Sequence, residues 1–175
     1  MKIIFTFIFV VVTSYAFSQN DITNRLTNYV KENYKIQYPN TWTIDTSRKM
    51  GAEFFIYSPK ENENDKFREN INFVIQDLHG QNIDLDKYAQ ITEQQIKDLA
   101  TDGKIYDSQK IKTAESEYYK MTYGMTQGIF KLKIEQYYFI KDEKAFVITF
   151  TSELDKFEAF KSVGEQILNS FKLTK

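Results

Sequence analysis

The chain has 175 residues with 23 basic and 24 acidic side chains, and its formal net charge at pH 7 is −1. Charges of both signs are interspersed along the sequence, which excludes the strongly basic surface that attracts nucleic acids or anionic membranes. The length suits one domain with one core, and because cysteine is absent this core must be stable without disulfides.

Residues 1–18 predict a secretory signal peptide. Lys2 precedes an apolar run at residues 3–12, and the segment ends at the small-residue site Ala16-Phe17-Ser18. The apolar run is too short to span a bilayer of about 30 Å, so cleavage is favoured over a retained anchor. We therefore expect a soluble periplasmic or secreted protein without stable membrane insertion. It is not expected to be a lipoprotein, because lipid attachment requires a cysteine at the cleavage point.

A lead-in segment is expected at residues 19–33, followed by a single domain at residues 34–175. In the first part of this domain, alternating apolar and polar side chains predict three strands, each bounded by proline or turn residues. These strands are residues 34–38, 53–57 and 71–75. The polar stretch at residues 60–66 predicts an exposed loop between the second and third strands.

The apolar period then changes to that of a helix. Tyr88, Ile91, Ile96 and Leu99 fall on one helical face and Asp84 is placed as the N-cap, which predicts a helix at residues 84–99. Four strands are predicted after it, with a tight turn joining the last two, at residues 104–113, 117–125, 130–141 and 144–151. An amphipathic helix is predicted at residues 157–171.

The strand at residues 130–141 indicates how these elements are layered. Its first half alternates between apolar residues and the charged residues Lys131, Lys133 and Glu135, whereas residues 137–140 are apolar on both faces. A strand with two apolar faces is covered on both sides. The sequence therefore predicts an α+β fold of the α/β/α sandwich type, with a central antiparallel sheet of about six to seven strands and helices on both faces.

Two short motifs in this order of elements resemble the PsbP-like family. Residues 38–42, Tyr-Pro-Asn-Thr-Trp, are similar to the family's Tyr-Pro-x-x-Trp opening, and residues 167–171, Ile-Leu-Asn-Ser-Phe, are similar to its terminal helix. The family includes the PsbP extrinsic proteins of photosystem II, the Ran-binding Mog proteins and bacterial periplasmic DcrB-like proteins. The resemblance covers residues 34–173, and it implies an α/β/α sandwich that binds proteins or stabilises complexes, mostly without catalysis. The family's metal-binding histidines have no counterpart here.

Three tyrosines are the candidate ligand-binding residues. Tyr119, Tyr123 and Tyr137 lie in two successive predicted strands, and tyrosine combines a large apolar body with a hydroxyl group. If the helices leave part of one sheet face open, these rings could line a shallow groove for an apolar or peptide ligand. Core packing under the helices is the favoured alternative, because an interior without disulfides needs bulky side chains.

Other candidate residues have structural explanations. Trp42 is expected to fill the edge of the core, and His79 to lie in a surface turn, because a lone histidine cannot form a usual zinc site. Glu61, Glu63 and Asp65 alternate as in a calcium loop, but the turn glycine of an EF-hand is missing. We expect no metal site, no cofactor and no enzyme, because the sequence has no cysteine nucleophile, Gly-x-Ser-x-Gly motif or phosphate-binding loop.

These observations favour a noncatalytic exported binding or accessory protein of the cell envelope, which acts through contact with an envelope protein. The alternative is a carrier that holds a small apolar ligand between sheet and helix, in a pocket of about several hundred cubic ångströms. A secretion chaperone, a role of some PsbP-like relatives, is disfavoured because those relatives act in the cytosol.

Overall fold

The structure is a computed structural model that describes residues 25–174, so the expected signal peptide lies outside the described residues. In chain order the strands are β1 (Leu26–Val30), β2 (Tyr34–Pro39), β3 (Thr43–Asp45), β4 (Phe54–Tyr57), β5 (Asn70–Asp77), β6 (Lys104–Lys112), β7 (Glu117–Gln127), β8 (Phe130–Lys141), β9 (Lys144–Glu153) and β10 (Lys172–Leu173). The helices are α1 (Leu85–Leu99) and α2 (Phe157–Ser170), and a short 3-10 helix, η2, is formed by Lys49–Gly51.

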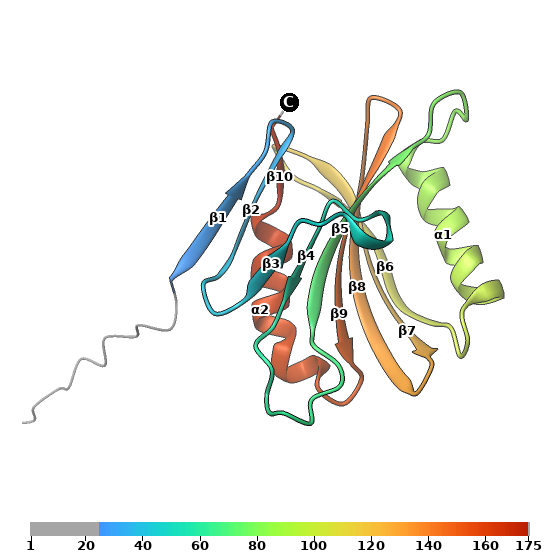
Figure 1. Ribbon diagram of the computed structural model, residues 1–175. Helices are drawn as coiled ribbons and strands as arrows, with labels where there is room; N and C mark the ends of the chain where they lie inside the picture. Colours follow the sequence, from blue (N-terminus) through green and yellow to red (C-terminus); the bar gives the residue numbers. More distant parts are fainter. Residues whose placement is uncertain (1–24, 175) are drawn as a thin grey trace, which may run out of the picture.

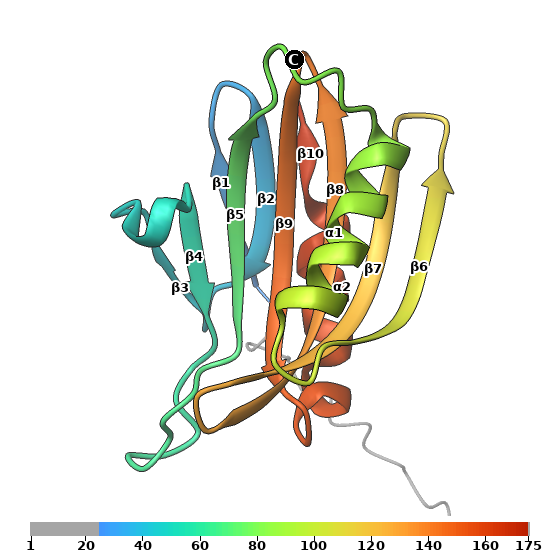
Figure 2. The same cartoon turned by 90° about the vertical axis from the view of Figure 1, so that its right-hand side faces the viewer.

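Seven strands form one antiparallel sheet in the order β3-β4-β5-β9-β8-β7-β6. Figure 1 shows α2 on one side of this sheet and α1 on the other. Figure 2 shows that α1 lies across the half of the sheet that contains β7 and β8. The predicted antiparallel sheet, its strand number and the placement of helices on both faces are confirmed.

The core on the α2 side is dominated by aromatic rings. Phe54, Phe73 and Phe150 are fully buried in the sheet, where they share one cluster with α2 residues such as Phe157. Gly164 allows α2 to approach the sheet closely, because a Cβ at this position would lie 2.7 Å from the ring of Phe150. Close packing of this kind leaves little space between α2 and the sheet.

The other face of the sheet packs more loosely against α1. Its buried cluster joins Ile96 of α1 to sheet residues that include Met121, Tyr123 and Tyr138. Within α1 only Ala89 and Ile96 are buried, because most of the helix consists of charged or amide side chains. This half of the molecule therefore contains the space for a surface groove.

Residues 137–140 are covered on both sides, as their sequence predicts. Tyr137 and Phe139 belong to the cluster on the α2 side, whereas Tyr138 belongs to the cluster on the α1 side. The turn from β8 to β9 is formed by Asp142 and Glu143, whose φ angles are 49° and 53°. Two consecutive residues with positive φ are typical of a tight hairpin turn whose twist matches that of the strands.

A second, three-stranded sheet was not expected from the sequence. Its order is β1-β2-β10, so the strand predicted at residues 34–38 lies here rather than in the central sheet. β1 lies in the segment expected to be a lead-in, and Tyr29 from this strand packs on the main core. β2 and β10 are joined by pairing of Lys35 with Lys172, a contact between distant parts of the chain that no local pattern reveals.

Glu135 is the exception to the alternation seen in β8. The pattern suggests a polar outer face at this position, but α2 covers it and Glu135 is buried. Its carboxylate lies 3.2 Å from Lys120 Nζ, which also contacts Glu165 of α2 at 3.0 Å. Within residues 25–174, neither helix has the length and apolar character needed to cross a membrane.

Candidate functional site

The three predicted site tyrosines do not share one groove. Tyr119 and Tyr123 lie on the α1 side of the sheet, whereas Tyr137 belongs to the core on the α2 side. The strand register explains the difference, because Tyr119 is paired with Tyr138 and Lys120 is paired with Tyr137. Directly paired residues point to the same face, so Tyr137 must point away from Tyr119.

Tyr137 instead helps to hold the end of α2. Its hydroxyl donates to Asn169 Oδ1 at 3.0 Å, and its ring packs 5.0 Å from that of Tyr118. Burial raises the pKa of the Tyr137 hydroxyl, so the group stays protonated at neutral pH. A cavity of about 190 Å³ borders these rings. The geometry is that of a structural contact beside a small surface hollow.

The α1 side contains an open groove of about 340 Å³ between the helix and the sheet. From α1 and the residue after it come Tyr88, Thr92, Gln95, Ile96, Leu99 and Ala100, and from β7, β8 and β9 come Tyr123, Met125, Gln136, Tyr138 and Val147. None of these side chains carries a charge at neutral pH. The groove therefore suits an apolar surface with a few hydrogen-bonding groups.

Polar contacts attach both ends of α1 to the sheet and leave the groove between them. At the start of the helix, Asp86 accepts hydrogen bonds from Lys110 Nζ and from the Tyr119 hydroxyl, each at 2.9 Å. Just beyond the other end, Asp102 accepts from the Thr126 hydroxyl at 2.7 Å. Tyr119 is thus a tether of α1 and is absent from the groove lining.

Three tyrosine hydroxyls give the groove its polar character. Tyr138 donates to Gln136 Oε1 at 2.7 Å, and Tyr88 donates to Gln76 Oε1 at 2.9 Å. Burial raises the pKa of Tyr123 to about 12 and also raises the pKa values of Tyr88 and Tyr138. All three therefore remain neutral at physiological pH and serve as hydrogen-bonding groups rather than as acids or bases.

Of these groove-lining residues, the sequence indicated Tyr123 as a candidate, but not Gln136 or Tyr138. Gln136 is held in the groove lining by the adjacent strand β9, because its amide donates to the hydroxyl of buried Thr149 at 2.9 Å. The signal for Tyr138 was available, since it follows Tyr137 and must occupy the opposite face of the strand. Tyr88 lies on the sheet-facing side of the helix, as its spacing predicts, and its ring packs on that of Tyr138 with centroids 5.6 Å apart.

A second cavity, of about 250 Å³, lies near the end of β8 and is more enclosed. Its lining includes Phe139 and Phe171 but also Glu117, Glu115 and Lys172. The last two pair across it at 3.1 Å, so charged groups of the chain already satisfy one another there. The uncharged and larger groove beside α1 is the better candidate for a binding site.

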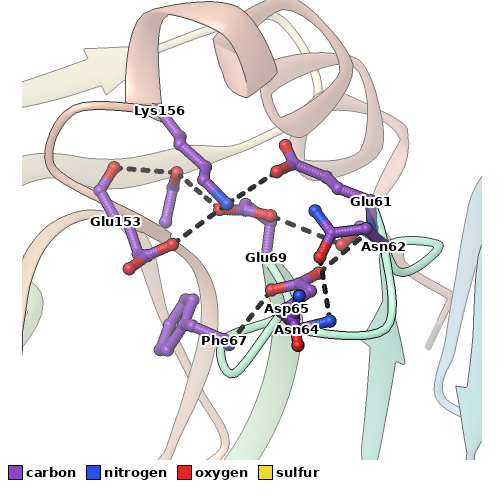
Figure 3. A network of polar contacts seen from close by, with 10 residues as sticks. Glu61, Asn62, Asn64, Asp65, Phe67, Glu69, Glu153 and Lys156 are labelled. Atoms are coloured by element: carbon purple, nitrogen blue, oxygen red, sulfur yellow. Dashed lines mark hydrogen bonds and ion pairs between the residues drawn. The ribbon is translucent and has the colours of Figure 1, made fainter.

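The acidic loop at residues 60–66 is stabilised by hydrogen bonds to Asp65 and by an ion pair with Lys156, just before α2 (Figure 3). Lys156 lies between Glu61 and Glu153, at 2.8 and 3.1 Å, and Asp65 accepts hydrogen bonds from backbone groups of the loop. Beneath them Glu69 is completely buried, with Ser152 Oγ 3.4 Å away. Among residues 25–174 no group of three or more His, Asp or Glu side chains is arranged to hold a metal ion.

The remaining candidate residues have structural positions. Trp42 is buried, and its ring packs edge-on against Phe160 with centroids 6.5 Å apart, as expected for a residue at the edge of the core. His79 is exposed in the turn after β5, and its Nδ1 lies 2.9 Å from Glu143 Oε2 in the β8–β9 turn. Neither residue borders the groove.

The central sheet is covered by α2 on one face and partly by α1 on the other. Solved structures with this arrangement show that the fold is the α/β/α sandwich of PsbP. Cyanobacterial PsbP (CyanoP) from Synechocystis sp. PCC 6803 matches with a TM-score of 0.65 and 15% identity, covering 85% of this chain and 92% of that one. The comparison confirms the fold that the resemblance implied.

Two further structures share the fold. LpqN, involved in cell envelope biogenesis of Mycobacterium tuberculosis, matches with a TM-score of 0.59 and 13% identity over 86% of this chain and 91% of that chain. PA94 from Pseudomonas aeruginosa, a protein of unknown function described as a putative regulator, matches with a TM-score of 0.56 and 12% identity over 84% and 96%. No family model and no curated protein matches the sequence.

Proposed function

We propose that this protein is a noncatalytic, exported accessory protein of the cell envelope, and that the groove beside α1 binds an apolar segment of a partner protein. The observation that carries the proposal is the groove itself, which is open and has no charged side chain in its lining. An open groove can receive side chains that remain part of a larger partner, whereas an isolated small ligand is better retained in an enclosed pocket.

The absence of charge in the groove also bears on catalysis. General acid–base or nucleophilic chemistry requires a titratable or activated group beside the substrate. The groove offers tyrosine hydroxyls whose pKa values burial raises, together with amide, hydroxyl and aliphatic side chains. Such a set can bind and orient a segment but has no group suited to accept a proton near neutral pH.

The predicted signal peptide and the likeness to LpqN support an envelope location. LpqN is described as involved in cell envelope biogenesis, and we propose that this chain also acts in the cell envelope, without carrying over LpqN's specific role. The proposal includes a periplasmic or secreted protein that is not a lipoprotein, because the sequence has no cysteine for lipid attachment.

The second candidate function is transport of a small apolar ligand. It is supported by the volume of the groove, about 340 Å³, which lies within the range of about 300–1,000 Å³ found for small-molecule sites. The two functions differ in what accompanies the protein when it is isolated without denaturant. A carrier would release a small molecule on unfolding, whereas an accessory protein would be found with another polypeptide.

The experiment compares two lysine substitutions in the protein isolated from its native envelope. Leu99 borders the groove and is 79% exposed, and Ile129 is 80% exposed on the turn between β7 and β8, outside the groove. We expect a partner protein to copurify with the wild type and with Ile129→Lys but to be lost from Leu99→Lys, because a charge at the groove opposes burial of an apolar segment. Retention of the partner by both variants, or its absence from the wild type, would refute the proposal.

A further inference from the structure

The outer edge of β1 has unpaired backbone groups. β1 and β2 are antiparallel, and Asn40 N–H donates to the Arg25 carbonyl at 2.9 Å while Lys31 N–H donates to the Tyr34 carbonyl at 2.8 Å. Both bonds involve odd-numbered residues, Arg25 and Lys31, so the odd-numbered residues of β1 are the ones whose backbone groups hydrogen-bond to β2. In an antiparallel pair the bonding direction alternates, so the N–H and C=O groups of Leu26, Asn28 and Val30 point away from β2.

Proline supports this assignment. Pro39 has no N–H group, and the register places it opposite Leu26, at a position where no hydrogen bond from β2 is required. Figure 1 shows β1 as the outermost strand of its sheet, and within residues 25–174 no strand pairs with its outer edge. The backbone N–H and C=O groups of three alternate residues, Leu26, Asn28 and Val30, are therefore available to another strand.

This edge lacks the features that usually prevent strand addition. Exposed edges are commonly protected by charged side chains, prolines, bulges or very short strands. β6, an edge of the central sheet, carries Lys104, Asp107 and Lys110 and has a register shift after Ile105, and the opposite edge, β3, has only three residues. β1 reads Leu-Thr-Asn-Tyr-Val, without charge, proline or register shift.

The side chains of the edge are self-complementary. Leu26, Asn28 and Val30 lie on the outer face of β1, and Leu26 and Val30 are 38% and 63% exposed. If two β1 strands pair antiparallel about Asn28, Leu26 of each copy lies opposite Val30 of the other. Cross-strand apolar pairs of this kind stabilise a sheet and would cover both exposed side chains.

We propose that β1 pairs with β1 of a second copy, antiparallel and centred on Asn28, so that the two small sheets become one continuous sheet. Each of Leu26, Asn28 and Val30 then donates one hydrogen bond and accepts one across a two-fold axis. Figure 1 shows β1 and α1 at opposite sides of the molecule, so pairing leaves the groove accessible. The inference goes beyond the proposed function and does not depend on it.

The interface is small, and the dimer should be weak. One strand pair with two apolar side chains per copy lies below the roughly 1,200 Å² of a standard protein interface. We expect a dissociation constant on the order of 10 µM. Sedimentation velocity of the exported protein, over concentrations that bracket this value, should show a reversible change from monomer to dimer.

Charge substitutions at Asn28 test the proposed register. Because Asn28 faces its own copy across the two-fold axis, Asn28→Lys places two lysines together, and we expect it to abolish the dimer. Asn28→Glu should do the same, whereas an equimolar mixture of the two variants should restore a mixed dimer. Thr43→Lys, an exposed substitution on β3, is the matched control and should dimerise like the wild type.

The absence of cysteine provides a direct geometric test. Hydrogen-bonded antiparallel residues have Cα atoms about 5.5 Å apart, so two thiols at position 28 would lie within reach of a short bifunctional thiol reagent. With such a reagent Asn28→Cys should therefore form a covalent dimer, and Thr43→Cys should not. A monomer at all concentrations, a dimer that persists in Asn28→Lys, or equal cross-linking of both cysteine variants would overturn the proposal.

Discussion

Glu69 is a buried carboxylate with weak compensation. Its side chain is fully buried, and the hydroxyls of Ser58 and Ser152 are 3.5 and 3.4 Å from its oxygens. Lys156 lies above it but is directly paired with Glu61 and Glu153 (Figure 3). Burial raises the pKa of Glu69 above its ordinary value, which means that the ionised carboxylate is less favourable in the folded protein than in the unfolded chain.

Replacing Glu69 by Gln should therefore stabilise the protein at neutral pH. A carboxyl whose pKa is raised on folding imposes its cost above the folded-state pKa, and the cost disappears as the pH falls below the ordinary value of 4.5. We expect Glu69→Gln to have a larger free energy of unfolding than the wild type at pH 7, and we expect the difference to shrink as the pH falls toward 4.5 and to be absent below it. Urea unfolding of both proteins at pH 7 and at a pH below 4.5 measures this difference.

Glu63 provides the control for this pH dependence. It is exposed in the same loop, so Glu63→Gln removes a carboxylate without changing a buried site. This variant should follow the wild type at both pH values. If Glu69→Gln is less stable than the wild type at pH 7, its contacts with the serines and Lys156 outweigh the burial of its charge, contrary to our interpretation.

At the scale of elements, α1 is stabilised mainly at its ends. Asp84 forms the predicted N-cap, with its carboxylate accepting from Lys87 N–H at 2.8 Å. Asp86 in the first turn is held by Lys110 and Tyr119, and hydrogen bonding to Lys110 lowers its pKa. Because few α1 residues are buried, the cap and this tether contribute a larger share of helix stability than in α2.

Removing the cap should loosen α1 selectively. We expect Asp84→Ala to cost about 1 kcal/mol of unfolding free energy and to speed hydrogen exchange of the first-turn amides of α1 more than that of β8 and β9. Asp98→Ala, near the opposite end of the helix, is the matched control. Asp98 opposes the helix dipole, so its removal should not destabilise the protein. Equal effects of the two substitutions would contradict the proposed role of the cap.

Element prediction succeeded where a local pattern was sufficient. The alternation in β8 and β9, the change of period at α1 and the cap at Asp84 are all local, and the structure confirms the elements that they predict. β1, β3 and β10 were missed because they are short and depend on pairing between distant segments, such as Lys35 with Lys172. Burial of Glu135 was also missed, because it results from coverage by α2 rather than from the pattern of β8.

The candidate site was harder to predict than the fold. The sequence placed Tyr88 on the sheet-facing side of its helix and named Tyr123 as a candidate, and both line the groove. It also grouped Tyr137 with Tyr119 and Tyr123, and only the register between β7 and β8 shows that Tyr137 faces the other way. That register places Lys120, not Tyr119, beside Tyr137. A site made by one helix and three strands depends on such pairings, and a single sequence does not specify them.

At the scale of the whole molecule, the two faces of the central sheet have different roles. The α2 side is a tightly packed aromatic core, which provides stability without disulfides. The α1 side is tethered at its ends and leaves an uncharged groove of about 340 Å³. If the groove binds a partner as we propose, a substitution at its exposed rim should change binding with little effect on folding, because few α1 side chains are buried.

If the groove beside α1 binds a partner protein in the envelope, as we propose, a crosslinking residue placed in the groove should capture that partner. Site-specific photo-crosslinking in the native host tests this proposal most directly, with the crosslinking residue placed at Gln95 in the groove or at Ser162 on the exposed side of α2. We predict one discrete crosslinked protein for position 95 and none for position 162. No crosslink at position 95, or the same products at both positions, would contradict it.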